Sequence, residues 1–483
     1  MKIATEGNLK NQIPEYYIQT FSLLFFPEDN FFGTRSQTKN SINISADKTG
    51  CCTEFAVDIC YGEKNSSKSS KTNKIRSEDL LLEIGKLFYA AAGEITGIYP
   101  PWGMHTGIRP AKTAGEILEK NNLDETKTLA ILRGNYLMSE KKAALALETH
   151  KNGKAAAFGA GKKDFSLYIS VPFCPTRCRY CSFVSFSTPR LLKLMPEYAK
   201  KLIEEIKLIS EITQDMRLKT IYIGGGTPTA LDASSLENIL RAVGESFDFS
   251  DLSEFTAECG RPDTITKQKL DLLKSFGINR TSVNPQTLND ETLKKIGRCH
   301  TAKDFFAAFE AARQSGIENI NTDLIIGLDG EQKDSMTATA KTLAALNPEN
   351  ITVHSLCLKK SSELKSEKTY NQTMPQLNET LDDIYDILKS SGYKPYYMYR
   401  QKYAAGNLEN TGFCQAGREC LYNIYMMDER MTIFGAGAGA MTKIVKDGRI
   451  ERIANFKYPY EYIGCDFQIK SEKNKNKLNI LKE

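Results

Sequence analysis

The sequence contains no apolar run of the roughly 18 residues that a membrane span needs. Its start, MKIATEGNLKNQIPEYY, lacks the apolar core of a secretory signal. Its 64 basic and 59 acidic residues leave a net charge of only +5, too slight to predict a nucleic-acid partner. We therefore expect a cytoplasmic protein without a membrane span. In that compartment the twelve cysteines are expected to be free, metal-bound or catalytic rather than paired in disulfides.

The length of 483 residues predicts two or three domains, with an ordinary balance of 41% hydrophobic and 25% charged residues. We place a first boundary near residue 160 and assign no role to the N-terminal region 1–160. Within it, 41–52 and 62–78 are rich in Ser, Asn and Lys and are predicted to be exposed loops or linkers. Apolar residues at helical spacing predict helices within 78–95 and 128–150.

From residue 161 to 365, short apolar or β-branched runs alternate with helical segments such as 196–212 and 302–316. Six candidate strands begin near residues 165, 219, 253, 279, 319 and 350. Six strand–helix units in series predict a parallel sheet, because parallel strands need crossover connections. The pattern fits an α/β fold that is either doubly wound or an incomplete barrel.

After residue 365 this regular alternation fades. We treat residues 366–470 as a C-terminal extension and residues 471–483 as a charged tail that is expected to fray.

The stretch YISVPFCPTRCRYCSF (168–183) directly follows the first of these strands. It carries Cys174, Cys178 and Cys181 at the spacing C-x3-C-x2-C, with no fourth cysteine close by. Four ligands usually complete a structural zinc site or a four-iron cluster. Three cysteines can bind three irons and leave the fourth open. S-adenosylmethionine (SAM) can chelate an open iron through its amine and carboxylate, and can receive an electron from the cluster. The motif therefore predicts a radical-generating cofactor pair.

Zinc is the alternative for these cysteines, because Cys178 and Cys181 alone form a C-x2-C half-site. A zinc site would need a second pair, and none has suitable spacing. Unligated thiols fit Cys51, Cys52, Cys60 and most of the scattered cysteines better. The scattered ones are Cys259, Cys299, Cys357, Cys414, Cys420 and Cys465.

The cysteine motif resembles the signature of radical SAM enzymes. The chain is most similar to the oxygen-independent coproporphyrinogen III oxidase branch, which includes haem chaperones of the HemW type, and within it to HemZ-type coproporphyrinogen dehydrogenases. TGIRP (106–110) and YRQKYAAGNLEN (399–410) are further features of the HemZ type. The resemblance covers about residues 100–465. It implies an incomplete (β/α)6 radical SAM barrel, with an N-terminal α/β region and a C-terminal extension that closes over the barrel.

A glycine-rich segment, GGGTP (224–228), follows the second strand. Three consecutive glycines weaken a fold, so we expect a close backbone approach to a ligand there. In similar proteins this segment meets the amino group of the methionine moiety of SAM, which implicates Gly225, Gly226 and Thr227.

Four polar residues follow successive strand ends with the order and spacing of the branch: Glu258, Gln286, Arg298 and Asp323. The resemblance implies that all four contact SAM. An arginine suits the carboxylate because its guanidinium donates two hydrogen bonds, and an aspartate suits ribose hydroxyls or an amine.

The resemblance adds three further cofactor contacts. Tyr168, on the first strand, matches a tyrosine near the cofactor and could equally be a core aromatic residue. Tyr180, just before the third cysteine, matches an aromatic residue under the adenine. Met441 follows the run GAGAGA (435–440), which lies too late in the chain, and outside a clear β-α-β unit, for a dinucleotide loop.

The reaction of the branch removes two propionate carboxyl groups from coproporphyrinogen III and leaves vinyl groups, which gives protoporphyrinogen IX in haem biosynthesis. The resemblance thus implies an oxidoreductase with a porphyrinogen substrate and an external one-electron donor such as flavodoxin or ferredoxin. The four substrate carboxylates favour basic pocket residues. The candidates are Arg109, Arg261, Arg400 and Lys402.

Three positions depart from the branch pattern. Phe183 stands where the oxidases have a further cysteine, and Ser170 where they have histidine. RECLYNI (418–424) lacks the histidine and tryptophan of the chaperone stretch His-Asn-x-x-Tyr-Trp. Three hypotheses follow: a coproporphyrinogen dehydrogenase, favoured by the whole chain; a haem chaperone of the HemW type with a [4Fe–4S] cluster; and a radical SAM enzyme with another substrate.

Overall fold

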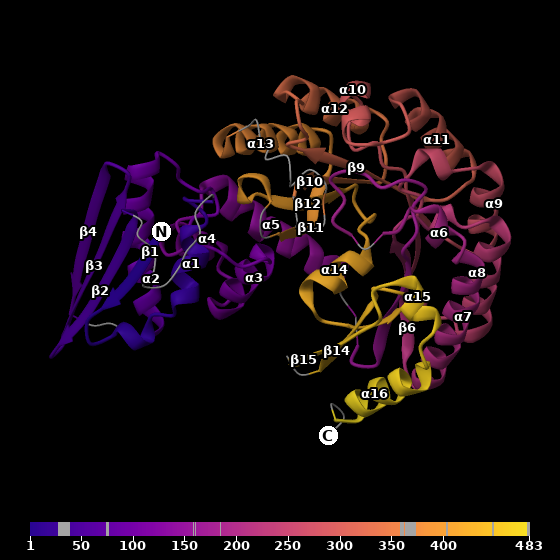
Figure 1. The fold of residues 1–483 in the computed structure, drawn as a ribbon, viewed down its shortest axis with the longest axis horizontal. Helices are drawn as coiled ribbons and strands as arrows, with labels where there is room; N and C mark the ends of the chain where they lie inside the picture. Colours follow the sequence, from indigo (N-terminus) through magenta and orange to yellow (C-terminus); the bar gives the residue numbers. More distant parts are fainter. Residues whose placement is uncertain are drawn as a thin grey trace.

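The structure is a computed structural model that describes residues 1–27, 39–73, 77–157, 159, 161–183, 185–357, 362, 373–401, 404–446 and 449–480. Two hydrophobic cores divide the chain. One gathers buried residues from Met1 to Met104, and the other begins at Trp102 and includes the large sheet. Figure 1 shows the smaller unit in indigo at the left and the larger one at the right. The core thus divides near residue 100 rather than at the expected position, 160.

The N-terminal unit packs two helices on a four-stranded sheet of order β1-β2-β3-β4, in which β1 and β2 are parallel and the other neighbours antiparallel. Its elements are β1 (Lys2–Glu6), η1 (Lys10–Gln12), α1 (Glu15–Ser22), β2 (Ser41–Thr49), β3 (Cys52–Tyr61), β4 (Lys64–Thr72) and α2 (Ser77–Thr96). The expected α/β region is present, and so is the helix expected within 78–95.

The expectation of loops or linkers at 41–52 and 62–78 is wrong, because β2 and β4 occupy most of these segments. In β2, Ile42 and Ile44 are buried on alternate positions. In β4, Ser66 alone is buried, and the strand is held by backbone pairing with β3 along its whole length. A strand with one solvated face needs few apolar residues, which is why composition misleads here.

Three further helices join the core of the large sheet: α3 (Pro110–Lys120), α4 (Glu125–Gly134) and α5 (Glu140–Ala156). Asp124 and Ser139 accept hydrogen bonds from the first turns of α4 and α5, as N-cap residues do. These two helices fulfil the expectation for 128–150.

All six expected strands of the core are present and run parallel in chain order. They are β5 (Asp164–Val171), β6 (Arg217–Gly225), β7 (Glu254–Glu258), β8 (Arg280–Ser282), β9 (Asn319–Ile326) and β10 (Asn350–Ser355). The helices between them are α6 (Pro189–Leu192), α7 (Met195–Ile212), α8 (Ala233–Ser246), α9 (Lys267–Ser275), α10 (Asp290–Lys295), α11 (Ala302–Gln314) and α12 (Lys333–Ala345), with η2 (Pro228–Ala230) and η3 (Pro262–Thr264). Figure 1 shows the longer helices in an arc on the outer face only. This is a partial barrel and not a doubly wound sheet.

The C-terminal extension adds strands to both edges of the barrel sheet, which reaches the order β11-β12-β10-β9-β8-β7-β6-β5-β13-β14-β15. Its elements are α13 (Met374–Ser390), β11 (Lys394–Arg400), η5 (Ala405–Asn407), β12 (Glu409–Cys414), α14 (Leu421–Asp428), β13 (Thr432–Ala436), β14 (Met441–Lys446), β15 (Arg449–Ala454), α15 (Pro459–Ile463) and α16 (Phe467–Ile480). No helix in the described ranges is long and apolar enough to cross a membrane.

Residues 471–480 of the expected charged tail are the last turns of α16, which continues to Ile480. Its first turns are anchored on α7. Lys470 pairs with the carboxylate of Glu205 at 2.5 Å, and the Phe467 ring lies 4.9 Å from that of Tyr462. Glu205 also accepts a hydrogen bond from the Tyr462 hydroxyl at 2.6 Å.

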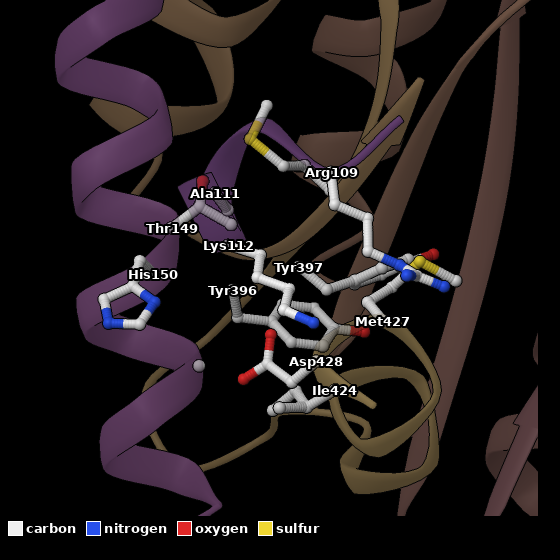
Figure 2. A pocket seen from close by; sticks show the side chains of 12 residues that line it. Arg109, Ala111, Lys112, Thr149, His150, Tyr396, Tyr397, Ile424, Met427 and Asp428 are labelled. Carbon is white, nitrogen blue, oxygen red and sulfur yellow. The ribbon is translucent and has the colours of Figure 1, made fainter. Parts of the chain in front are cut away.

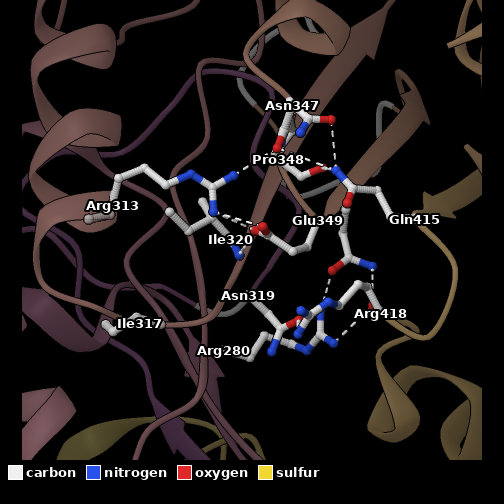
Figure 3. Close-up of polar contacts among 12 residues, drawn as sticks. Arg280, Arg313, Ile317, Asn319, Ile320, Asn347, Pro348, Glu349, Gln415 and Arg418 are labelled. Atoms are coloured by element: carbon white, nitrogen blue, oxygen red, sulfur yellow. Dashed lines mark hydrogen bonds and ion pairs between the residues drawn. The ribbon is translucent and has the colours of Figure 1, made fainter. Parts of the chain in front are cut away.

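The amino ends of the barrel strands are closed by the loop between β12 and α14 (Figure 3). Gln415 donates to the side chain of Asn347 at 2.9 Å, and Arg280 donates to the backbone oxygens of Arg418 and Glu419 at 3.0 Å each. The loop therefore forms a floor beneath the barrel.

A buried carboxylate on β7, Glu254, fixes the start of α14 above this floor. It accepts hydrogen bonds from the backbone N–H groups of Leu421 at 2.8 Å and Tyr422 at 3.2 Å, and pairs with Arg280 at 3.3 Å. A helix N-terminus stabilises a carboxylate because its first N–H groups lack partners within the helix.

A second buried ion pair joins α5 to β12 and α13. Lys142 is fully buried, and its ammonium lies 2.7 Å from the carboxylate of Glu409 and 2.9 Å from that of Asp382. The indole N–H of Trp102 donates to Glu409 at 2.6 Å. Such a pair is costly to break, because removal of one partner leaves the other charge buried and unpaired.

We expect Lys142→Ala to destabilise the protein by about 3–5 kcal/mol, measured by denaturant unfolding. Lys141→Ala is the matched control, because the neighbouring Lys141 pairs with Asp386 on the surface. We expect its loss to stay within about 1 kcal/mol. Equal losses for the two variants would contradict a special role for the buried pair.

Candidate functional site

The three cysteines lie on the loop that follows β5, at the carboxyl edge of the barrel sheet. Backbone hydrogen bonds hold the two ends of this loop together: Cys174 N–H donates to Phe186 at 3.1 Å, and Phe186 N–H donates to Pro172 at 2.8 Å. Cys181 N–H donates to the carbonyl of Cys178 at 3.0 Å, so the last two cysteines share one tight turn.

Each thiol has a different polar neighbour. Cys174 Sγ lies 3.3 Å from the Thr227 hydroxyl, and Cys181 Sγ lies 3.8 Å from the Ser185 hydroxyl. Arg261 donates to Cys178 Sγ at 3.5 Å. Burial raises the pKa of the Cys174 thiol above its ordinary value.

Among the residues that the structure describes, no three metal-binding side chains converge on one point as a single ion would require. A cubane cluster does not require its ligands to converge on one point, because each thiolate binds a different iron at a different corner. Three thiols turned toward separate neighbours around one loop fit a cluster, and they do not form a tetrahedral zinc site.

The glycine-rich segment packs directly against the cysteine loop. Gly226 N–H donates to Val171 at 2.8 Å and Thr227 N–H to Phe173 at 2.7 Å. A Cβ atom on Gly226 would lie 2.5 Å from the Phe173 carbonyl oxygen, so only glycine allows this approach. The triple glycine thus has a structural reason, and contact with a ligand stays a prediction.

Glu258 ends β7 inside the barrel and accepts a hydrogen bond from the Tyr222 hydroxyl. Burial raises the pKa of Glu258 to about 7, against the effect of the Tyr222 hydrogen bond, and the nearby Asp323 adds to the rise. The Tyr222 ring stacks with Tyr168 at 6.3 Å and with Tyr422 at 4.4 Å. Tyr168 is therefore part of a stack of three tyrosines, partly buried itself, next to the carboxylate that was expected to meet the cofactor.

Asp323, on β9, has two amide neighbours and a histidine. Asn284 and Asn321 donate to its two carboxylate oxygens at 2.8 and 2.7 Å. The imidazole of His354, near the end of β10, lies 3.7 Å away.

Gln286 has a positive φ of 68°, which is strained for a residue with a side chain. Two backbone hydrogen bonds to β9 hold it there: Gln286 N–H donates to Asp323 at 3.0 Å, and Ile325 N–H donates to Gln286 at 2.9 Å. Its side-chain oxygen is buried and has no hydrogen-bond partner among the described residues.

Arg298 and Tyr180 are brought together, because Arg298 donates to the Tyr180 hydroxyl at 3.1 Å. A second guanidinium nitrogen donates to the carbonyl of Gly260 at 3.1 Å. The Nε–H group is buried and has no partner in the described part of the chain. Unpaired buried polar atoms on both Gln286 and Arg298 suit a polar ligand such as SAM, which would satisfy them.

Met441 is not brought into this group. It begins β14 next to Gly435, and its side chain is 45% exposed. A contact between Met441 and the cofactor remains a prediction.

The basic residues expected in the substrate pocket have partners within the protein. Arg109 pairs with Glu429 at 2.6 Å, and Arg261 pairs with Asp263 at 2.8 Å. Arg400 is buried and donates to backbone oxygens of His105 and Asn407, which is a structural role. Lys402 lies outside the described residues.

Figure 2 shows the small cavity beside Arg109, lined from α3, α5, β11 and α14. Lys112 and Asp428 lie close together there, with His150 to one side on α5. The cavity is narrow and already holds opposite charges, so it is not a porphyrinogen pocket.

Sequence reasoning missed Tyr222, Arg261, Tyr422 and His354 as members of the site. Tyr222 and His354 could have been found from their places near the ends of parallel strands. Arg261 was named only as a substrate contact, and Tyr422 only within the stretch compared with the chaperones.

Comparison with known proteins agrees with this geometry. Residues 168–343 match the model of the radical SAM superfamily. The chain is 38% identical over 376 residues to the oxygen-independent coproporphyrinogen-III oxidase-like protein HemZ of Bacillus subtilis, which covers 76% of this chain and 75% of that protein. It is 34% identical over 308 residues to the haem chaperone HemW of the same organism, covering 61% of this chain and 77% of HemW.

Among solved structures, coproporphyrinogen III oxidase (HemN) from Escherichia coli is similar with a TM-score of 0.54 and 23% identity, covering 66% of this chain and 72% of that one. This likeness supports the fold. A partial barrel with three cysteines after its first strand defines a radical SAM protein. The chain belongs to the oxygen-independent coproporphyrinogen III oxidase-like branch of the radical SAM superfamily. Its cofactors are a [4Fe–4S] cluster and SAM.

We expect Cys174→Ala, Cys178→Ala and Cys181→Ala each to abolish the visible absorbance and the iron content of the anaerobically reconstituted protein. Cys299→Ala is the matched control. Cys299 is exposed, and its sulfur lies 3.6 Å from the Thr176 hydroxyl on the same loop. A cluster lost in Cys299→Ala would mean that four cysteines bind it.

Proposed function

We propose that the protein is an oxygen-independent coproporphyrinogen III dehydrogenase. Each of two propionate groups would lose a hydrogen atom, CO2 and one electron to become a vinyl group, and the electron would pass to an external acceptor. The observation that carries the proposal is the group of Glu258, Gln286, Arg298 and Asp323 beside the cysteine loop, in a chain similar to HemZ over three quarters of its length.

Different residues of this chain would bind the cluster and SAM. Cys174, Cys178 and Cys181 would bind three irons, and the two cofactors when bound supply one-electron chemistry that removes an unactivated hydrogen. Among the described residues, the Arg298 Nε–H and the side-chain oxygen of Gln286 have no partner, so the first can donate to a carboxylate and the second can accept a hydrogen bond. An external one-electron donor, such as flavodoxin or ferredoxin, would deliver the electron.

The haem chaperone alternative has less support from the site. Its comparable stretch, 418–424, is packed into the barrel. Cys420 is buried and donates to Glu254 at 3.3 Å, while Tyr422 lies in the tyrosine stack. This stretch therefore offers no exposed ligand for haem iron.

The proposal is tested by anaerobic reconstitution followed by reductant, SAM and coproporphyrinogen III. We expect 5′-deoxyadenosine and protoporphyrinogen IX to form together, detected by mass spectrometry, and both to vanish in Cys178→Ala. Deoxyadenosine without a porphyrin product would contradict the substrate while leaving the radical chemistry intact. Tight binding of haem without either product would favour the chaperone.

We expect SAM binding to weaken as the pH falls below about 7. Burial raises the pKa of Glu258 to about 7, and a ligand with a positive sulfonium favours the ionised carboxylate. Protonation of Glu258 then opposes binding by up to about tenfold per pH unit below the pKa. Isothermal titration between pH 6 and 8 measures this slope, which should flatten in Glu258→Gln. An unchanged slope in that variant would assign the pH dependence to another group.

A further inference from the structure

A buried arginine, Arg261, lies directly against the cysteine loop, and neither the family signature nor the predicted SAM contacts include it. We propose that Arg261 is a positioning residue that raises the reduction potential of the cluster through its contact with the Cys178 sulfur. This inference rests on the cluster and is independent of the porphyrinogen substrate.

Every nitrogen of the Arg261 guanidinium donates at least one hydrogen bond. Nη1 donates to Cys178 Sγ at 3.5 Å and to the carbonyl of Thr176 at 3.2 Å. Nη2 donates to the Thr176 hydroxyl at 2.9 Å. On its other side, Asp263 accepts from Nε at 2.9 Å and from Nη2 at 2.8 Å. The side chain is 3% exposed, so this fork is rigid and shielded from water.

The fold explains this position. Arg261 follows Glu258 by three residues, on the turn that leaves β7 and begins η3. The turn therefore presents a carboxylate to the barrel interior and a guanidinium to the cysteine loop within four residues. A lysine could not replace all of these contacts, because only the planar fork of an arginine can donate to Asp263, Thr176 and Cys178 together.

A fixed positive charge beside a cluster thiolate has a predictable effect. Reduction adds a negative charge to the cluster, and a nearby cation or a hydrogen bond to a ligand sulfur stabilises the more negative state. Burial strengthens the effect because water does not screen it. Arg261 should therefore make the cluster easier to reduce by the external donor.

Substitutions in the ion pair between Arg261 and Asp263 should shift the midpoint potential of the cluster in opposite directions. Arg261→Gln removes the positive charge and should lower the midpoint potential. Asp263→Asn removes the negative partner, leaves the arginine charge uncompensated and should raise the potential. A loop that merely loosened would respond in the same direction to both changes.

Thr176→Val is the matched control for the position of the loop. It removes the hydroxyl that accepts from Nη2 at 2.9 Å, while the contact to Cys178 and both charges remain. We expect this variant to keep the potential of the unaltered protein.

The measurement is an anaerobic redox titration of the reconstituted full chain, followed by the electron paramagnetic resonance signal of the reduced cluster. We expect Arg261→Gln to weaken the reduction equilibrium at least tenfold, which is about 59 mV for one electron. Arg261→Lys should recover part of this shift, and it serves as the test if the glutamine variant does not hold a cluster. Iron content and the thermal unfolding midpoint verify that each variant is folded and loaded.

Three results would overturn the proposal: an unchanged potential in both Arg261 variants, shifts of the same sign in Arg261→Gln and Asp263→Asn, or a shift in Thr176→Val equal to that of Arg261→Gln. None of these readouts depends on coproporphyrinogen III, so a failure of the proposed enzymatic activity would be seen separately.

Discussion

The need to compensate charge inside the barrel organises this structure. Glu254 and Arg280 project from strands into a space shielded from water, where an unpaired ion is costly. At the amino ends of the strands, Arg280 pairs with Glu254, and the start of α14 supplies two backbone donors to the same carboxylate. The position of α14, and with it Tyr422 in the tyrosine stack, follows from that requirement.

The residues predicted to bind the cofactors lie at the carboxyl ends of the strands. Gln286 and Arg298 keep buried polar atoms unpaired among the described residues, and Gln286 keeps a strained backbone. Unpaired groups and strain persist where the surrounding structure enforces them, and such sites are commonly functional. The unpaired atoms of Gln286 and Arg298 and the strain at Gln286 therefore favour the carboxyl ends of the strands as the ligand-binding end of the barrel.

The sequence predicted the barrel well because its strands are buried runs separated by helices, and because the cofactor residues stand at strand ends in chain order. Glu258, Asp323 and the three cysteines could therefore be placed at strand ends before any coordinates, while their cofactor roles came from the resemblance and stay predictions. β4 could not, because KNSSKSSKT becomes a strand only through pairing with β3. Contacts between distant segments, such as Arg261 with Cys178 or Tyr422 with Tyr222, leave no periodic signal in one dimension.

The contact between the segment before α3 and strands β11 and β12 has a consequence for spectroscopy. The sequence contains one tryptophan, Trp102, which lies at this contact. Its indole N–H donates to Glu409, and the Arg400 guanidinium lies 5.8 Å from its ring. All tryptophan emission therefore comes from a single buried position. The wavelength of that emission reports whether this contact with the sheet is intact. It needs no added label and is separate from any change at the cluster.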